Sequence, residues 1–128
     1  MDIINVFLVY LPVLTDMLEL FFLLAIGHAI ADYALQNDFM AAAKNHTTEL
    51  GKIYWKWVLP SHGLIHAGFV YLFTGSFVLA FAEFAVHSIT DYLKCDGKIG
   101  FQTDQWIHIG CKMFWVVLLA FEVPFILE

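Results

Sequence analysis

Four long apolar stretches follow one another along the chain, and short polar segments separate them. They cover residues 17–36, 61–74, 77–93 and 103–123, with Gly75-Ser76 as a tight turn between the second and third and Thr103 as the cap of the fourth. A helix needs about 20 apolar residues to cross the hydrocarbon core of a bilayer. The pattern therefore predicts four membrane helices. The second stretch is short for this task, which implies local thinning of the bilayer or shielding by its neighbours.

The segment before these stretches, residues 1–16, is expected to form a separate short helix. Its uncharged part, residues 3–14, is too short to cross about 30 Å of hydrocarbon as a helix. We therefore expect an interfacial or half-buried helix that ends near Pro12. The segment lacks the basic first residues and the cleavage site of a secretory signal, so it is expected to stay on the protein.

The composition agrees with a membrane protein. Of the 128 residues, 61% are hydrophobic and only 14% are charged, which is far from the usage of an ordinary soluble domain. No run of Ser, Pro or Gly marks a linker, so residues 1–128 are expected to form a single domain. The predicted fold is all-α: an integral membrane four-helix bundle with an additional short N-terminal helix.

The charge distribution excludes one class of partner and predicts an orientation. The net charge is −6 and the six lysines form no basic stripe, so nucleic acid is not an expected partner. Two loops contain five of the lysines. Lys44, Lys52 and Lys56 lie between the first and second stretches, and Lys94 and Lys98 lie between the third and fourth. Because cytoplasmic loops are enriched in lysine and arginine, we expect a multi-pass protein of the inner (cytoplasmic) membrane with both termini outside.

Each predicted membrane helix carries one pair of polar residues spaced four positions apart. The pairs are His28 and Asp32, His62 and His66, His87 and Asp91, and Asp104 and His108. Residues four apart lie on the same face of a helix. Successive helices alternate in direction, and the pairs alternate between helix end and helix start, so all four pairs are expected at one depth. For a single pair, a polar side chain hydrogen-bonded inside a bundle is an equal alternative, but four pairs at one level favour a metal site.

These eight residues offer enough ligands for two metals. Mixed nitrogen and oxygen donors suit transition metals better than Mg²⁺ or Ca²⁺. The prediction is one or two divalent ions, with Zn²⁺ as the first candidate and Fe, Mn, Co or Ni as alternatives. Some of the eight could instead orient ligands, because a ligating imidazole usually donates its other N–H to a carboxylate. The sixth histidine, His46, is expected to be a solvated loop residue.

Three further polar residues extend the same helix faces. Gln36, Glu83 and Lys112 each lie four positions from one of the eight. They are expected to orient ligands or to bind an anionic substrate. For Glu83 and Lys112, a mutual ion pair near the membrane centre is an equal alternative. Lys94 is interpreted as an anchor at the membrane surface, not as a catalytic group.

The order of four motifs resembles a known family. The segments HAIADYALQNDFMAAAK, HGLIH, HSITDYLK and DQWIH are similar to the small polytopic membrane proteins of bacteria and phages described as domain of unknown function 3307. The resemblance covers nearly the whole chain and implies no particular reaction. It matches the family's polar positions to His28, Asp32, Gln36, His62, His66, His87, Asp91, Asp104 and His108.

The leading functional hypothesis is a membrane-embedded, metal-dependent hydrolase whose site faces the cytoplasm. A bound metal lowers the pKa of water, and a carboxylate can take the proton. Asp32, Asp91 or Asp104 is expected to be the acid or base, without a preference among them. The expected substrate is a lipid, a lipid-linked phosphate or a nucleotide, so membrane lipid and a small molecule are the expected partners. The alternatives are a di-iron lipid oxidoreductase and a non-enzymatic metal or proton conduit.

Overall fold

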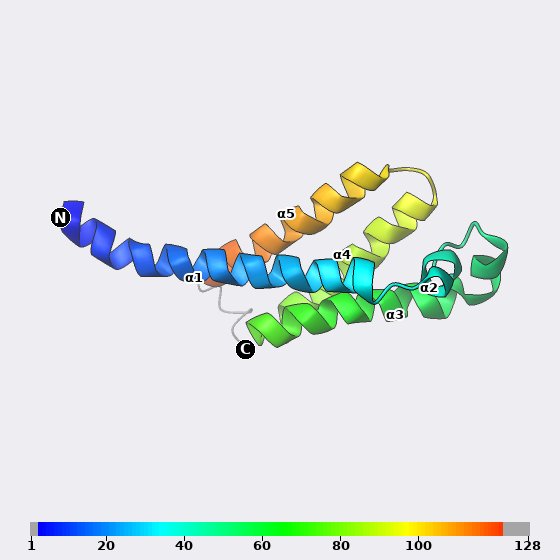
Figure 1. Ribbon diagram of the computed structural model, residues 1–128, viewed down its shortest axis with the longest axis horizontal. Helices are drawn as coiled ribbons and strands as arrows, with labels where there is room; N and C mark the ends of the chain where they lie inside the picture. Colours follow the sequence, from blue (N-terminus) through cyan, green and yellow to red (C-terminus); the bar gives the residue numbers. More distant parts are fainter. Residues whose placement is uncertain (1–2, 122–128) are drawn as a thin grey trace.

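The computed structural model describes residues 3–121, and this part of the chain folds into five helices without a strand (Figure 1). The helices are α1 (Ile3–Ala29), α2 (Asp38–Ala43), α3 (Glu49–Thr74), α4 (Phe77–Cys95) and α5 (Phe101–Ala120). One π-helical turn, η1 (Ile30–Ala34), continues α1. The all-α prediction is confirmed.

The four long helices pack as antiparallel neighbours. α1 contacts α3 and α5, and α4 contacts the same two helices from the other side. The tight turn predicted between α3 and α4 is present: Gly75 ends α3 with a φ of 69°, and the Ser76 side chain accepts a hydrogen bond from the backbone N–H of Leu79. The first turns of α1 extend beyond the other helices (Figure 1).

The N-terminal region differs from the expected separate helix. α1 has no end near Pro12 and continues through it to Ala29. A proline removes one backbone hydrogen bond without stopping the helix here. By length and composition, one helical stretch within residues 3–121, Leu11–Ala34, is apolar enough to cross a membrane. The histidine, aspartate and lysine side chains of the later helices lower their mean hydropathy.

Two other helix starts differ from the predicted positions. α3 begins at Glu49, twelve residues before the expected start at Ser61, because the Thr48 hydroxyl caps it by accepting a hydrogen bond from the N–H of Gly51. The 26 residues of α3 continue through Pro60, and at 1.5 Å per residue they extend over about 39 Å. α5 begins at Phe101 after Gly100, so Thr103 is not its cap.

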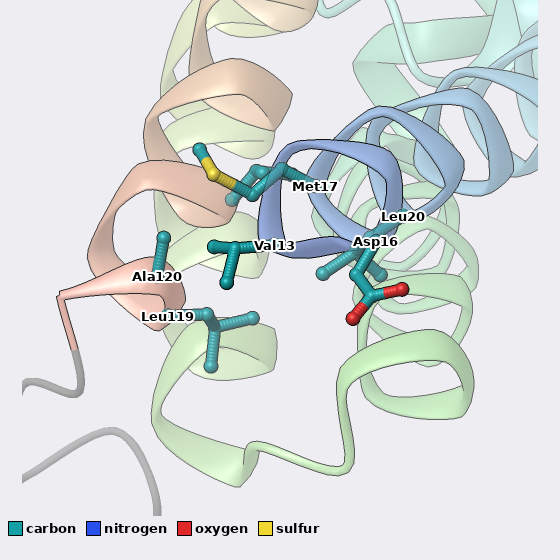
Figure 2. A pocket seen from close by; sticks show the side chains of 7 residues that line it. Val13, Asp16, Met17, Leu20, Leu119 and Ala120 are labelled. Atoms are coloured by element: carbon teal, nitrogen blue, oxygen red, sulfur yellow. The ribbon is translucent and has the colours of Figure 1, made fainter. Parts of the chain in front are cut away.

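The interior has an apolar level and a polar level. Five buried side chains form the apolar core: Leu24, Val70, Leu79, Trp115 and Val116. Next to this level, α1 and α5 leave an open groove of about 310 Å³, where Val13, Met17 and Leu20 face Leu119 and Ala120 (Figure 2). Histidine, aspartate, glutamate and lysine side chains fill the polar level. The candidate functional residues are in this polar level, one helical turn beyond the apolar core.

Candidate metal centre

The structure brings the four predicted His and Asp pairs together in one buried cluster. All five histidines of the pairs are at most 4% exposed, and Asp91 and Asp104 are at most 1% exposed. The rings of His66 and His87 stack with centroids 3.5 Å apart, and those of His87 and His108 stack at 4.1 Å. The four pairs therefore converge, as the alternation of helix directions predicted.

Asp32 lies in the π turn at the end of α1. In this turn the N–H of Leu35 donates to the carbonyl of Ile30, five residues earlier. The Oδ1 atom of Asp32 lies 3.0 Å from Nε2 of His66 and 3.3 Å from Nε2 of His62. Such turns are frequent at functional sites, and here the turn carries a carboxylate that lies near two imidazoles of α3.

The carboxylates of α4 and α5 lie on the other side of the cluster. Asp91 Oδ2 is 3.5 Å from Nε2 of His62, and Asp104 Oδ1 is 3.3 Å from Nε2 of His108. A carboxylate from each of three helical segments, η1, α4 and α5, thus reaches an imidazole of the cluster.

The ligand atoms form two groups that share no residue. One contains Asp32, His62, His66 and His87, and the other contains Asp91, Asp104 and His108; within each group, one ligand atom per residue lies within 4.8 Å of the others. A third group, Glu83, His87 and His108, overlaps both. His28 belongs to none of the three, although its Nε2 lies 3.4 Å from Asp32 Oδ2.

Several polar atoms of the cluster have no hydrogen-bond partner within the described part of the chain. These are both ring nitrogens of His62, His87 and His108, Nδ1 of His28 and of His66, and Oδ1 of Asp104, and all are buried. Each unsatisfied buried polar group costs about 1–3 kcal/mol. A divalent transition metal would accept a lone pair from one nitrogen of an imidazole and from a carboxylate oxygen, and the mixture of imidazole and carboxylate donors fits such an ion.

Lys94, which was interpreted as an anchor at the membrane surface, and Lys44, which was assigned to a loop, both point into the cluster instead. Lys44 Nζ lies 2.5 Å from Asp91 Oδ2, and Lys94 Nζ lies 2.8 Å from both Asp91 Oδ1 and Asp104 Oδ2. Burial alone would lower the pKa of Lys94, but Asp91 and Asp104 outweigh it and raise that pKa above its usual value. Lys94 follows Asp91 by about one helical turn, so the sequence alone could have indicated their contact. Lys44 has no such signal, because it lies 47 residues from Asp91.

Gln105 is a further residue that the sequence analysis did not single out. Its Nε2 donates to Asp32 Oδ2 and to Asp104 Oδ2, at 3.1 Å each. It therefore links the two ligand groups. Its place next to Asp104 was the only available signal. Gln36, which was expected to orient ligands, has a buried Oε1 without a partner among residues 3–121.

Glu83 and Lys112 form the ion pair that was one of the two alternatives for them. Lys112 Nζ lies 2.5 Å from Glu83 Oε1, both residues are 1% exposed, and the indole N–H of Trp115 donates to Glu83 Oε2 at 2.8 Å. Glu83 Oε1 is also 3.7 Å from Nδ1 of His87. The pair thus lies between the imidazoles and the apolar core.

His46 lies outside the cluster, but the expectation that it is solvated is wrong. Its side chain is only 15% exposed, its Nε2 lies 2.8 Å from Asp96 Oδ1, and its ring stacks on Tyr92 with centroids 4.2 Å apart. Hydrogen bonds from Lys98 and His46 lower the pKa of Asp96 below its usual value. His46 therefore connects the α2–α3 loop to the α4–α5 loop.

Comparison with known proteins identifies a family. No curated protein and no solved structure matches the chain. The family model described as "Protein of unknown function (DUF3307)" matches residues 20–124, which contain every residue of the cluster. The match covers most of the chain, and it confirms the family expected from the four motifs. The chain therefore belongs to this DUF3307 family of proteins of unknown function.

Proposed function

We propose that the protein is a membrane-embedded, metal-dependent hydrolase. The observation that carries the proposal is the convergence of buried imidazoles, three of them without a hydrogen-bond partner at either ring nitrogen, on the carboxylates of Asp32, Asp91 and Asp104. Ionisable groups in such an interior are costly unless they are paired, bind metal or face water. Metal coordination would satisfy one nitrogen of each ligating imidazole together with the carboxylate oxygens.

The distribution of side chains supports the membrane part of the proposal. Large apolar side chains point outward on every long helix, for example Phe22 at 66%, Leu72 at 70%, Phe81 at 63% and Phe114 at 53% exposure. Exposed apolar surface of this extent is unfavourable in water, whereas lipid covers it without cost. In this proposal α1, α3, α4 and α5 form a bundle in the inner (cytoplasmic) membrane. The lysine-containing loops face the cytoplasm, and both termini lie outside.

The two separate ligand groups support two metal positions. Asp32, His62, His66 and His87 would hold one ion, and Asp91, Asp104 and His108 would hold the other. Zn²⁺ is the first candidate, and Fe, Mn, Co and Ni remain alternatives. A divalent ion held by these residues would supply a water of lowered pKa and a Lewis acid for an oxygen of the substrate.

The protein's own residues perform the remaining steps. Gln105 holds Asp32 and Asp104 in a fixed relation. Glu83 Oε1 lies 3.7 Å from Nδ1 of His87, and it would accept a hydrogen bond from that nitrogen once Nε2 holds metal. One of Asp32, Asp91 and Asp104 would serve as the acid and base instead of holding metal, and it would take the proton from water and return it to the leaving group. Substrate enters beside Lys94, whose side chain is 24% exposed while those of Asp91 and Asp104 are almost fully buried.

The apolar core favours an enzyme over a metal or proton conduit. A conduit needs polar groups through the full thickness of the membrane. Among residues 11–121, whose burial is described, the buried charged side chains end at Glu83 and Lys112, and the apolar side chains of Leu24, Val70 and Leu79 close the interior beyond them. A site with one closed end suits a substrate that enters and leaves on the same side.

The test compares metal content with turnover in three variants. Asp32→Asn, Asp91→Asn and Asp104→Asn are purified in detergent, and hydrolysis of a lipid phosphate, a nucleotide and an ester is measured. At least one variant should keep its metal and lose turnover. Asp38→Asn, at an exposed position in α2, is the control and should keep both. The proposal falls if the wild-type protein hydrolyses none of these substrates but moves metal or protons across sealed vesicles.

A further inference from the structure

The two lysines give the metal centre an unusual charge when it is loaded. The cluster contains three carboxylates, of Asp32, Asp91 and Asp104, and two ammonium groups, of Lys44 and Lys94. The nearby Glu83 and Lys112 cancel each other. Two divalent ions would therefore leave the centre with three positive charges in excess, or two if one ion holds hydroxide. A buried excess of this size is strongly unfavourable without a counter-anion.

The lysines are not needed to balance the carboxylates once metal is bound. Asp91 and Asp104 both belong to the second ligand group, so an ion there would neutralise the same carboxylates that Lys44 and Lys94 contact. Each ammonium carries three donors and no acceptor. In a metal-loaded centre, the ammonium groups of Lys44 and Lys94 would therefore need another anion to replace these carboxylates as their partners.

The position of Lys94 shows where such an anion would be held. Its Nζ bridges carboxylates that are at most 1% exposed, while its own side chain is 24% exposed. The ammonium thus lies between the carboxylates and the surface. Next to it, the amide of Gln105 donates to Asp32 and Asp104, and the Tyr33 hydroxyl donates to Gln105 Oε1 at 3.5 Å. An entering anion therefore meets the ammonium of Lys94 before it reaches the metal ligands.

We propose that the substrate carries a terminal phosphate or diphosphate, and that Lys44 and Lys94 bind its oxygens when metal occupies the carboxylate ligands. This inference rests on the proposed function, with both metal positions filled. A phosphate monoester brings about two negative charges at neutral pH, which matches the excess. A carboxylate or a phosphate diester brings only one charge, and a neutral ester brings none. Lysine also binds phosphate well as a point charge.

The experiment measures phosphate binding and metal content in the same samples. Wild type, Lys44→Gln and Lys94→Gln are purified in detergent and loaded with Zn²⁺, the ion content is determined by elemental analysis, and binding of inorganic phosphate and pyrophosphate is measured by calorimetry. Each variant should keep its metal and bind both anions about tenfold or more weakly, because a charge-assisted hydrogen bond is lost. Lys52→Gln is the control, since Lys52 is exposed and contacts only Glu49. It should bind as the wild type does.

Conservative variants separate lost charge from lost folding. Lys44→Arg and Lys94→Arg keep the charge and should retain most of the binding that the Gln variants lose. A second arm compares glycerol phosphate with phosphatidic acid in the same micelles. Tighter binding of the lipid assigns the phosphate to a membrane headgroup, and equal binding assigns it to a soluble ester; either supports the inference.

Three results would overturn the inference. Two of them leave the proposed function standing, and the third removes the proposed function as well. If the fully metal-loaded protein hydrolyses a neutral ester but binds no phosphate, or if both Gln variants bind phosphate as the wild type does, the substrate class is wrong and the proposed function stands. If the wild-type protein binds no metal at all, the proposed function and this inference fail together.

Discussion

Nε2 of His66 lies 3.0 Å from Oδ1 of Asp32, although 34 residues separate them in the chain. The same imidazole stacks on His87, with ring centroids 3.5 Å apart. Three segments, η1, α3 and α4, therefore meet at one side chain that is 1% exposed. The ring therefore makes two contacts at once, through its nitrogen to the carboxylate of Asp32 and through its face to His87. We expect His66 to be among the ligands whose loss affects metal binding most.

The first prediction concerns metal content. Protein purified in detergent should contain one or two transition metal ions per chain, because a set of buried, converging ligands is costly to leave unsatisfied. His66→Ala and His87→Ala should each lower this content, since both residues belong to the first ligand group. The measurement is elemental analysis of material never exposed to a chelator.

His46→Ala serves as the control for this prediction. His46 contacts Asp96 just after α4 and Tyr92 in the last turn of α4, and it belongs to none of the ligand groups. Its removal should therefore leave the metal content unchanged. Equal losses in the three variants would mean that the ions bind through general folding and not through the cluster. Wild-type content well below one ion per chain would remove the metal centre altogether.

The cluster was predictable from the sequence because helical geometry fixes it locally. Pairs such as His62 and His66 lie on one face by their spacing, and the short turns between helices set the alternation that brings the pairs together. Each pair alone was compatible with an ordinary buried polar contact. The combination of four pairs carried the prediction, and the structure confirms their convergence.

The contacts that the sequence did not predict depend on long-range packing. Lys44 reaches Asp91 because α2 folds back on α3, and no local pattern encodes that return. Pro12 was interpreted as a helix end, and the second membrane helix was expected to begin at Ser61, directly after Pro60, yet both prolines lie inside helices. A proline disfavours helix only by a few kcal/mol, and at Pro60 the packing of α3 against α1, α2 and α4 outweighs this cost. The cap at Thr48 was a local signal that marked the true start of α3.

The second prediction tests the junction that positions Lys44. A Cβ on Gly51 would lie 1.7 Å from the backbone oxygen of Asn45, so no side-chain rotation can relieve the clash. Gly51→Ala should lower the free energy of unfolding by about 3 kcal/mol or more. Gly68 has open space around its Cβ position, so Gly68→Ala should raise stability by about 0.5–1 kcal/mol through helix propensity alone. Thermal unfolding of both variants in one detergent provides the comparison, and equal effects would contradict the α2–α3 packing.

The third prediction concerns the orientation in the membrane. In a background with Cys95→Ser and Cys111→Ser, Phe77→Cys should react with an impermeant thiol reagent on intact cells. Glu49→Cys should react only after lysis, because the lysine-containing loops are expected in the cytoplasm. Both positions suit labelling: the Glu49 side chain is 90% exposed and Phe77 is 69% exposed. Labelling of the Glu49→Cys variant from outside would reverse or remove the proposed topology.

The fourth prediction concerns the buried ion pair of Glu83 and Lys112. Removing one partner leaves the other charge buried, which typically costs about 3–5 kcal/mol. Glu83→Gln should lower the free energy of unfolding more than Lys112→Met does. In Glu83→Gln, the buried ammonium of Lys112 loses its carboxylate partner. In Lys112→Met, the carboxylate of Glu83 keeps the hydrogen bond from Trp115. The double variant should be less destabilised than the sum of the two single variants, since it leaves no unpaired charge. Thermal unfolding of all four proteins gives this coupling energy.

The exposed pair of Glu49 and Lys52 is the matched control for that cycle. Its Nζ–Oε1 distance is also 2.5 Å, but the two side chains are 90% and 58% exposed. Water and salt screen such a pair, so Glu49→Gln should change the free energy of unfolding by less than about 1 kcal/mol. A small effect at both pairs would mean that water reaches Glu83 and Lys112. Water would then enter the polar level from the side of the apolar core. The argument that the site is closed at this end, and is therefore not a conduit, would fail.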